Sequence, residues 1–376
     1  MEINAFFQAV KLDELGLTNI SQKNFPVIIS QENKALFPFS QFQVALIGLR
    51  QNHFDESSSL IRKALYQLNS EVFTDEVCDL GNFVYGKGSA DQNIEKLAHV
   101  LYHLLSRNCS PLIFGGPTYF IKAYYMAYEQ FAKGVKLCCI DKDIAYHRED
   151  DHNVSYLNGI IDSEKAYLAD LRLLGIQNHR QMPESLAWME KSPFESMRLG
   201  EIKNTKRAVE PILRDSNIIS FNLSALKGSE APEAQSPGPN GLSGEDACLI
   251  ARYAGISEKC STFSINGLTS LDKGFYLSPK LIAEIIWYFL EGRTNRLSEN
   301  PLTDENKFIR YALQLKHLHY PIYFFKSTIT DRWWMSIDEN GKILTPSTYD
   351  DYLIACQGEI PDNWWKAVQK RDFTTE

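Results

Sequence analysis

Short, continuously apolar segments alternate along the chain with amphipathic helical segments, and this alternation limits the possible folds more than any other feature. The apolar segments have the length of β-strands and fall at 43–49, 111–116, 136–141, 218–223 and 262–266. Helical patterns lie between or after them, at 57–68, 89–108, 120–134, 243–255 and 278–292. Strands that are apolar on both faces are covered by helices on both sides. The sequence therefore predicts a three-layer α/β/α domain on a mostly parallel, doubly wound sheet.

Residues with capping chemistry indicate where several of these helices begin. Ser89 is expected to cap the helix of 89–108, and Ser243 with Asp246 has the spacing of a capping box. Ser278 is expected to cap the last of these helices, with a proline in its first turn. In a sheet of this class the binding crevice lies at the carboxyl ends of the strands. The residues that follow these strands are therefore the candidates for a site.

Seven segments, taken in order, resemble the ureohydrolase family of arginase, agmatinase and formimidoylglutamase. They are LIGLRQN, LIRKALYQL, CDLGN, PLIFGGPTYF, CCIDKDIAYH, IISFNLSAL and SPGPNGLSGEDA, within roughly residues 40–295. The last segment is similar to the Pro-Gly-Gly-Leu turn that leads into a helix in this family. The resemblance implies an arginase-like fold, a pair of manganese ions that activate water for attack on an amidine carbon, and assembly into symmetric rings.

The metal-binding motifs of the family are altered in this chain. Thr118 stands where the family's Gly-Gly-Asp-His has its histidine. The Asp-Ala-His-x-Asp motif corresponds to residues 141–145, where Asp141 is kept, Asp143 replaces the histidine and Ala145 replaces the last ligand. Lys142, inside this motif, should point away from Asp141 by strand alternation.

Two further motifs have lost their carboxylates. Ser-Phe-Asp-x-Asp corresponds to residues 220–224, with Asn222 and Ser224 in place of the two acids, and Tyr276 stands at a later glutamate position. Two divalent ions held close together need several carboxylates, and Asp141 is the one retained. The sequence therefore predicts a non-catalytic binding or structural protein with no catalytic residue, metal or other cofactor. The residues expected in its cleft are Asp141, Asp143, His147, Asn222, Ser224 and Tyr276.

A rebuilt metal site is the alternative hypothesis. The segment DKDIAYHREDDH, residues 141–152, carries carboxylates and imidazoles after a strand, and mixed ligands of this kind can bind a metal. A solvated acidic loop is the simpler interpretation. Under the alternative, the protein is a divergent manganese-dependent amidine hydrolase of formimidoylglutamase or arginase type.

Composition restricts the partners and the compartment. A formal net charge of −8 and a pI near 5.6 give no general attraction to nucleic acid or anionic lipid, so neither is an expected partner. The N-terminal residues do not resemble a secretory signal, and no apolar segment is long enough to span a membrane. Seven scattered cysteines indicate reduced thiols in a cytoplasmic protein. Cys138 and Cys139, adjacent on one strand, should point to opposite faces.

Two extensions flank the region of resemblance, which belongs to a domain of residues 1–300. Residues 1–40 are expected to form short elements on the domain edge. Residues 301–376 contain four of the six tryptophans and are expected to begin with a helix and continue with strands and a turn at 339–342. So many large aromatic side chains predict docking, on the same chain or on a neighbouring subunit of a homo-oligomer. The partner, a small molecule or a protein, is not specified by the sequence.

Overall fold

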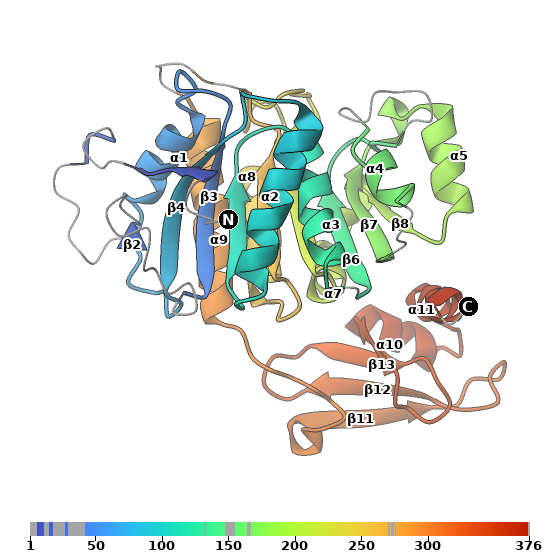
Figure 1. Ribbon diagram of the computed structural model, residues 1–376. Coiled ribbons are helices and arrows are strands. Elements are labelled where there is room, and N and C mark those ends of the chain that lie inside the picture. The colour runs from blue at the N-terminus through green and yellow to red at the C-terminus, as the bar shows by residue number, and fades with distance from the viewer. Residues whose placement is uncertain are drawn as a thin grey trace.

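A wide, mostly parallel sheet forms the centre of the computed structural model, which describes residues 6–10, 15–17, 27–28, 42–131, 133–146, 155–163, 167–269, 271, 274 and 276–374. Within these residues the sheet has ten strands: nine follow the order β1-β4-β3-β5-β10-β9-β6-β7-β8, and β2 pairs with β4. Only the β1–β4 pairing among them is antiparallel. The strands are β1 (Phe7–Gln8), β2 (Val27–Ile28), β3 (Val44–Arg50), β4 (Val77–Val84), β5 (Ser110–Phe114), β6 (Val135–Ile140), β7 (Leu168–Ile176), β8 (Glu195–Arg198), β9 (Ile218–Asn222) and β10 (Thr262–Asn266). The predicted mostly parallel α/β architecture is confirmed (Figure 1).

Helices cover both faces of this sheet (Figure 1). One face packs against α1 (Ser57–Leu65), α6 (Leu199–Asn204), α7 (Val209–Arg214), α8 (Gly244–Ile256) and α9 (Ser278–Thr294). The opposite face packs against α2 (Ala90–Leu105), α3 (Ile121–Glu129), α4 (Asn158–Ile161) and α5 (Pro183–Lys191). Cys138 belongs to the first apolar cluster and Cys139 to the second, which confirms that adjacent residues of β6 point to opposite faces.

Two of the three predicted helix caps are present. The Ser89 side chain accepts a hydrogen bond from the backbone N–H of Gln92, and Ser243 and Asp246 form a capping box. The prediction for Ser278 is wrong by one residue, since Ser278 is the first residue of α9. Its hydroxyl donates to the carboxylate of Glu233, so it serves a contact with the preceding loop instead of the helix end.

The C-terminal residues form a second, antiparallel sheet in the order β11-β12-β13-β14 (Figure 1). The prediction that residues 301–376 begin with a helix is wrong. A short 3-10 turn, Glu305–Lys307, leads directly into a strand whose six residues all pair with β12. Pairing with this neighbour outweighs the helical pattern of the local sequence. The elements are β11 (Phe308–Leu313), β12 (Ile322–Ser327), β13 (Trp333–Ser336), β14 (Leu344–Ser347), α10 (Tyr349–Cys356) and α11 (Asp362–Thr374).

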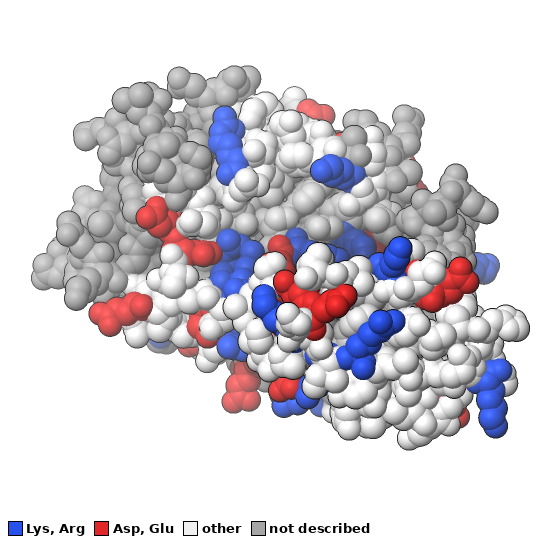
Figure 2. Space-filling model, turned by 90° about the horizontal axis from the view of Figure 1, so that it is seen from below, with Lys and Arg blue, Asp and Glu red and all other residues white. Residues whose placement is uncertain are grey.

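The ten-stranded sheet and the helices α1–α9 that cover it form the main body of the protein. The second sheet and its helices contact this main body at the amino-terminal ends of the parallel strands. Lys370 of α11 pairs with Asp170, near the start of β7, and with Glu195, the first residue of β8. The Arg214 guanidinium lies 4.2 Å from the ring centroid of Trp334 and donates to the carbonyl oxygen of Trp333. Seen from the side of the second sheet, acidic and basic side chains are interspersed across this face (Figure 2).

Most of the N-terminal extension, residues 1–40, lies outside the described residues; β1 and β2 are the parts of it that pair with the main sheet. In the part of the chain that the structure describes, no helix is both long and apolar enough to cross a membrane.

Candidate functional site

Three of the predicted site residues meet at the carboxyl ends of β6 and β9. Asp141 follows β6 directly, Asn222 is the last residue of β9, and Ser224 lies in the short turn that follows. The two strands are parallel neighbours in which Ile140 pairs with Phe221. Asp141 and Asn222, the residues that come directly after this pair, therefore lie side by side, although 81 positions separate them in the chain.

The Asp141 carboxylate accepts hydrogen bonds on both of its oxygens. Asn222 Nδ2 donates to Oδ2 at 2.6 Å, and Ser224 Oγ donates to Oδ1 at 2.7 Å. The backbone N–H of Lys142 also donates to Oδ1, at 2.7 Å. Tyr156 completes the group with a longer contact from its hydroxyl to Oδ2, at 3.5 Å. Asp141 is 3% exposed, so these neutral donors take the place of water around a buried carboxylate.

The backbone around Asn222 fixes which end of its amide faces Asp141. The backbone N–H of Ser224 donates to Asn222 Oδ1 at 3.0 Å, so the amide oxygen is turned away from Asp141 and the NH₂ group toward it. Gly267 lies against the same oxygen, with a φ of +86°, and a Cβ at this position would lie 2.2 Å from Oδ1. The glycine thus permits both the backbone conformation and the close approach.

Burial dominates the electrostatics of Asp141. It raises the pKa of the carboxyl group above its usual value, and the hydrogen bonds from Ser224 and Asn222 act in the opposite direction. The nearby Asp143 carboxylate raises the pKa further. The cluster thus contains one buried carboxyl group that accepts hydrogen bonds from neutral donors. Among the described residues this carboxyl group forms no ion pair.

These residues do not fit a pair of divalent metal ions. A metal needs free lone pairs from several anionic ligands, whereas at this cluster Asn222 and Ser224 direct donor groups onto the one buried carboxylate. Within the described residues, no group of three or more His, Cys, Asp or Glu side chains is arranged to hold a metal ion. The cluster is therefore a hydrogen-bonded polar core at the strand ends.

The neighbouring predicted residues point elsewhere. The side chain of Asp143 is 40% exposed and pairs with Arg180 at 3.3 Å, although its backbone N–H contacts Asp141 Oδ1 at 3.3 Å. Ala145 is buried in the apolar cluster that covers the second face of the sheet. Neither side chain adds a metal-binding group beside the Asp141 carboxylate.

Two of the remaining predicted residues, Thr118 and Tyr276, lie in the described part of the chain. Thr118 begins the 3-10 turn Thr118–Phe120 after β5 and is half-buried. Tyr276 packs against the apolar cluster of the first face, just before α9. His147, like the rest of the acidic loop 147–152, lies outside the described residues.

Lys142 points away from Asp141, as strand alternation predicts. Its side chain is buried, and Nζ donates to the hydroxyl of Ser236 at 3.0 Å and to the carbonyl oxygen of the same residue. Burial lowers the pKa of Lys142, and the positive charge of Arg180 lowers it further. The lysine thus ties the end of β6 to the Pro/Gly loop that precedes α8.

Sequence reasoning missed a second polar group on the next strand. Asn266, the last residue of β10, donates to the carbonyl oxygen of Gly115 at 3.1 Å and shares a hydrogen bond with the hydroxyl of Tyr124. The signal was available, because Asn266 ends β10 as Asn222 ends β9. Ser220 and Ser264 extend this polar row inside the sheet, 2.9 Å apart.

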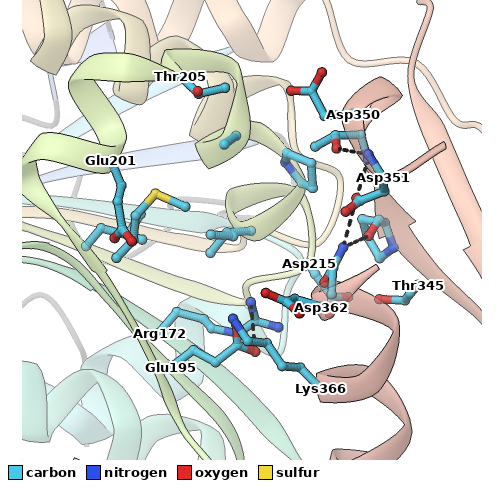
Figure 3. A pocket seen from close by; sticks show the side chains of 18 of the residues that line it. Arg172, Glu195, Glu201, Thr205, Asp215, Thr345, Asp350, Asp351, Asp362 and Lys366 are labelled. Atoms are coloured by element: carbon cyan, nitrogen blue, oxygen red, sulfur yellow. Dashed lines mark hydrogen bonds and ion pairs between the residues drawn. The ribbon is translucent and has the colours of Figure 1, made fainter. Parts of the chain in front are cut away.

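A hollow of about 480 Å³ lies at the opposite edge of the sheet, against the second sheet (Figure 3). Lys366 of α11 lies beside Arg172 and Glu195 of the main sheet, and Asp350, Asp351 and Asp362 are further residues of α10 and α11 in the lining. The first three charges are paired with one another, with contacts of 3.3 Å from Arg172 and 3.2 Å from Lys366 to Glu195. These ion pairs therefore join α11 of the C-terminal part to β7 and β8 of the main sheet.

Comparison with known proteins gives the class of fold. No protein-family profile and no curated protein sequence matches the chain. Solved structures do match. The match with formiminoglutamase of Trypanosoma cruzi, a structure described with Mn²⁺, has 16% sequence identity and a TM-score of 0.63. It covers 70% of this chain and 97% of the formiminoglutamase chain. Another protein of that organism, described as belonging to the arginase superfamily, matches at 18% identity with a TM-score of 0.62, over 69% of this chain and 98% of its own. The chain thus has an arginase-like α/β fold.

Two structures from other organisms agree with this class. Formimidoylglutamase of Bacillus subtilis matches at 16% identity with a TM-score of 0.61, over 76% of this chain and 99% of its own. Agmatine ureohydrolase of Thermoplasma volcanium matches at 17% identity with a TM-score of 0.57, over 75% of this chain and 98% of its own. At these identities the likeness shows the fold and does not carry over an activity.

Proposed function

We propose that this protein is a non-catalytic member of the ureohydrolase fold class that has lost the binuclear manganese site and acts in binding or in structure. The proposal rests on one observation: Asn222 and Ser224 donate hydrogen bonds to Asp141 at positions where the family resemblance implies metal-binding carboxylates. A donor group bonded to the remaining carboxylate competes with a cation for the same lone pairs. The cluster is then a structural element that closes the end of β6 onto β9.

The hydrogen-bonding pattern supports a stabilising role for these residues. Each polar atom of the cluster that is buried has a partner, including the Asn222 oxygen, which accepts from Ser224 N. A buried carboxylate satisfied in this way holds neighbouring loops in one arrangement, because breaking any one bond leaves a desolvated polar atom. The same edge of the sheet is where a ligand or protein partner would bind in an α/β fold of this type.

The experiment is a measurement of metal content by elemental mass spectrometry, after incubation with manganese and desalting, with assays on guanidino and formimino compounds. Asp141→Ala tests the retained acid, and Asp162→Ala, at an exposed acid of the same half of the chain, is the matched control. We expect less than stoichiometric manganese in all three proteins and no turnover.

About two manganese ions per chain in the wild type and in the control, absent from Asp141→Ala and accompanied by turnover, would overturn the proposal. That result would favour the divergent amidine hydrolase, with metal collected by Asp141, Asp143 and the acidic loop. Manganese bound equally by all three proteins, without turnover, would place the metal away from Asp141 and leave the interpretation of the strand-end cluster unchanged.

A further inference from the structure

A large hollow, distinct from the strand-end cluster, lies between the main body and the second sheet. Its volume is about 1040 Å³, at the upper end of the range for small-molecule sites. The main body contributes residues of α7, α8 and the end of α9, and the second sheet contributes β11, β12, β13 and α10. The second sheet contacts the amino-terminal ends of the parallel strands, whereas Asp141 lies at their carboxyl ends. The hollow and Asp141 are therefore at opposite ends of the strands.

Four aromatic rings form one wall. Trp333 is at their centre, with ring-centroid distances of 5.6 Å to Tyr311, 4.9 Å to Tyr352 and 5.6 Å to Tyr349. Tyr311 and Tyr352 are within 30° of parallel to the tryptophan ring. Tyr349 is 54% exposed, although it is an aromatic side chain beside a buried tryptophan. This wall therefore presents a stacked aromatic surface with an open ring at its rim.

Cationic side chains lie around the same hollow. Arg207, Arg252, Lys326 and Arg332 line it, against two acids, Glu210 and Asp331. Arg252 pairs with Glu291 and Lys326 with Asp331, whereas the exposed side chain of Arg207 makes no hydrogen bond or ion pair within the described part of the chain. Arg332 pairs with Glu210 and Glu299, so Arg207 is the cation of the lining left without an acidic partner among the described residues.

A buried arginine lies next to this lining. Arg214, behind the aromatic wall, shares the Glu210 carboxylate with Arg332, at 3.2 and 3.3 Å. Its Nη1 has no hydrogen-bond partner among the described residues. Burial and the neighbouring Arg332 lower the pKa of Arg214 to about 10, so it remains charged at neutral pH. Arg332 also pairs with Glu299, at 3.4 Å, so the two guanidinium groups are matched by two carboxylates.

We propose that this hollow binds an anion that carries a flat aromatic ring, and that a nucleoside monophosphate is the ligand class. The open face of Tyr349 and the ring of Tyr352 offer stacking for a base, a contact that every base can make. The guanidinium of Arg207 offers a planar donor fork for a phosphate group. The inference does not depend on the proposed function, because none of its residues belongs to the Asp141 cluster.

Isothermal titration calorimetry of the full chain tests this, with adenosine 5′-monophosphate, adenosine and inorganic phosphate as three separate probes. We expect the monophosphate to bind at least about tenfold more tightly than either part alone, because stacking and charge act together. Tyr349→Ala and Arg207→Ala should each weaken its binding about tenfold. Both side chains are exposed, so neither substitution should unfold the protein.

Matched controls remove the same groups elsewhere. Tyr288→Ala removes an exposed tyrosine of α9, and Lys203→Ala removes an exposed cation of α6, neither of which lines the hollow. Both should bind the monophosphate as the wild type does. No heat of binding for the monophosphate at millimolar concentration would overturn the proposal. So would binding that phosphate alone reproduces, or binding that Tyr349→Ala and Arg207→Ala leave unchanged.

Discussion

The side-chain amide of Asn222 donates to the carboxylate of Asp141 over 2.6 Å, and the amide oxygen is held by the backbone N–H of Ser224. This relationship defines the strand-end cluster, because an acid at position 222 would place two carboxylates in contact in a buried place. Like charges at that distance cannot both remain ionised without a cation between them.

Asn222→Asp tests this relationship directly. We expect the free energy of unfolding at pH 7.5 to fall by roughly 1–3 kcal/mol, since a donor is lost and a second buried acid is added. Both carboxyl groups then have raised folded-state pKa values, so the variant should regain stability as the pH falls toward 5. Thermal unfolding between pH 5 and 7.5 measures this. Asn240→Asp, at an exposed position of the neighbouring loop, should show no such dependence.

The same variant separates the two functional hypotheses when manganese is added. If the acids at positions 141 and 222 suffice to gather a cation, millimolar manganese should raise the melting temperature of Asn222→Asp and leave the wild type unchanged. An equal rise in the wild type would indicate that the native residues bind metal.

Gly267→Ala should destabilise the fold through the same cluster. The new Cβ would lie 2.2 Å from Asn222 Oδ1, and alanine at a φ of +86° is strained. We expect a loss of roughly 1–3 kcal/mol, measured by urea unfolding. Gly200→Ala is the matched control, since nothing lies within 4 Å of its Cβ and alanine favours the helix α6. A loss of the same size in the control would contradict the assignment.

The ion pair of Arg62 and Asp79 is the deepest charge contact in the main body. Both side chains are fully buried, and Arg62 donates to the two carboxylate oxygens at 2.7 and 2.9 Å. Asp79→Asn should cost about 3–5 kcal/mol, because it leaves a guanidinium buried without its counter-charge. Chemical unfolding measures the loss. Asp91→Asn, whose acid is 77% exposed in its pair with Lys122, should stay within about 1 kcal/mol.

Glu195 should connect the second sheet to the main body in a pH-dependent way. Burial would raise its pKa, but Arg172, Lys370 and Lys366 outweigh burial and lower it to about 2. A lowered folded-state pKa contributes stability that is present above about pH 4.5 and is lost as the pH falls toward 2.

Glu195→Gln should therefore unfold more readily at pH 7, by roughly 2–3 kcal/mol, and should lose less stability than the wild type between pH 4.5 and 2. Calorimetric scans across that interval measure the difference. Glu359→Gln, at an exposed acid, is the control. Parallel pH profiles for Glu195→Gln and the wild type would exclude Glu195 as the titrating group.

Local periodicity was sufficient to predict the layers of the fold. Continuous apolar strands such as β5 and β9 have no solvent-facing side, so helices on both faces follow from the strand sequences themselves. The capping boxes at Ser89 and Ser243 are also local, since each joins residues three positions apart. The prediction of a helix in the segment that forms β11 was wrong because β12, which follows later in the chain, supplies the pairing that makes this segment a strand.

The sequence by itself determined the parallel α/β sheet, and it identified Asp141, Asn222 and Ser224 as residues at or just beyond the carboxyl ends of strands. Only the tertiary structure decided what they do to one another. The adjacency of β6 and β9, strands separated by β7 and β8 in the chain, sets the distance between Asp141 and Asn222. The backbone of the following turn sets which atom of the amide faces the acid. Hydrogen-bond direction depends on such long-range geometry, and residue type and spacing do not contain it.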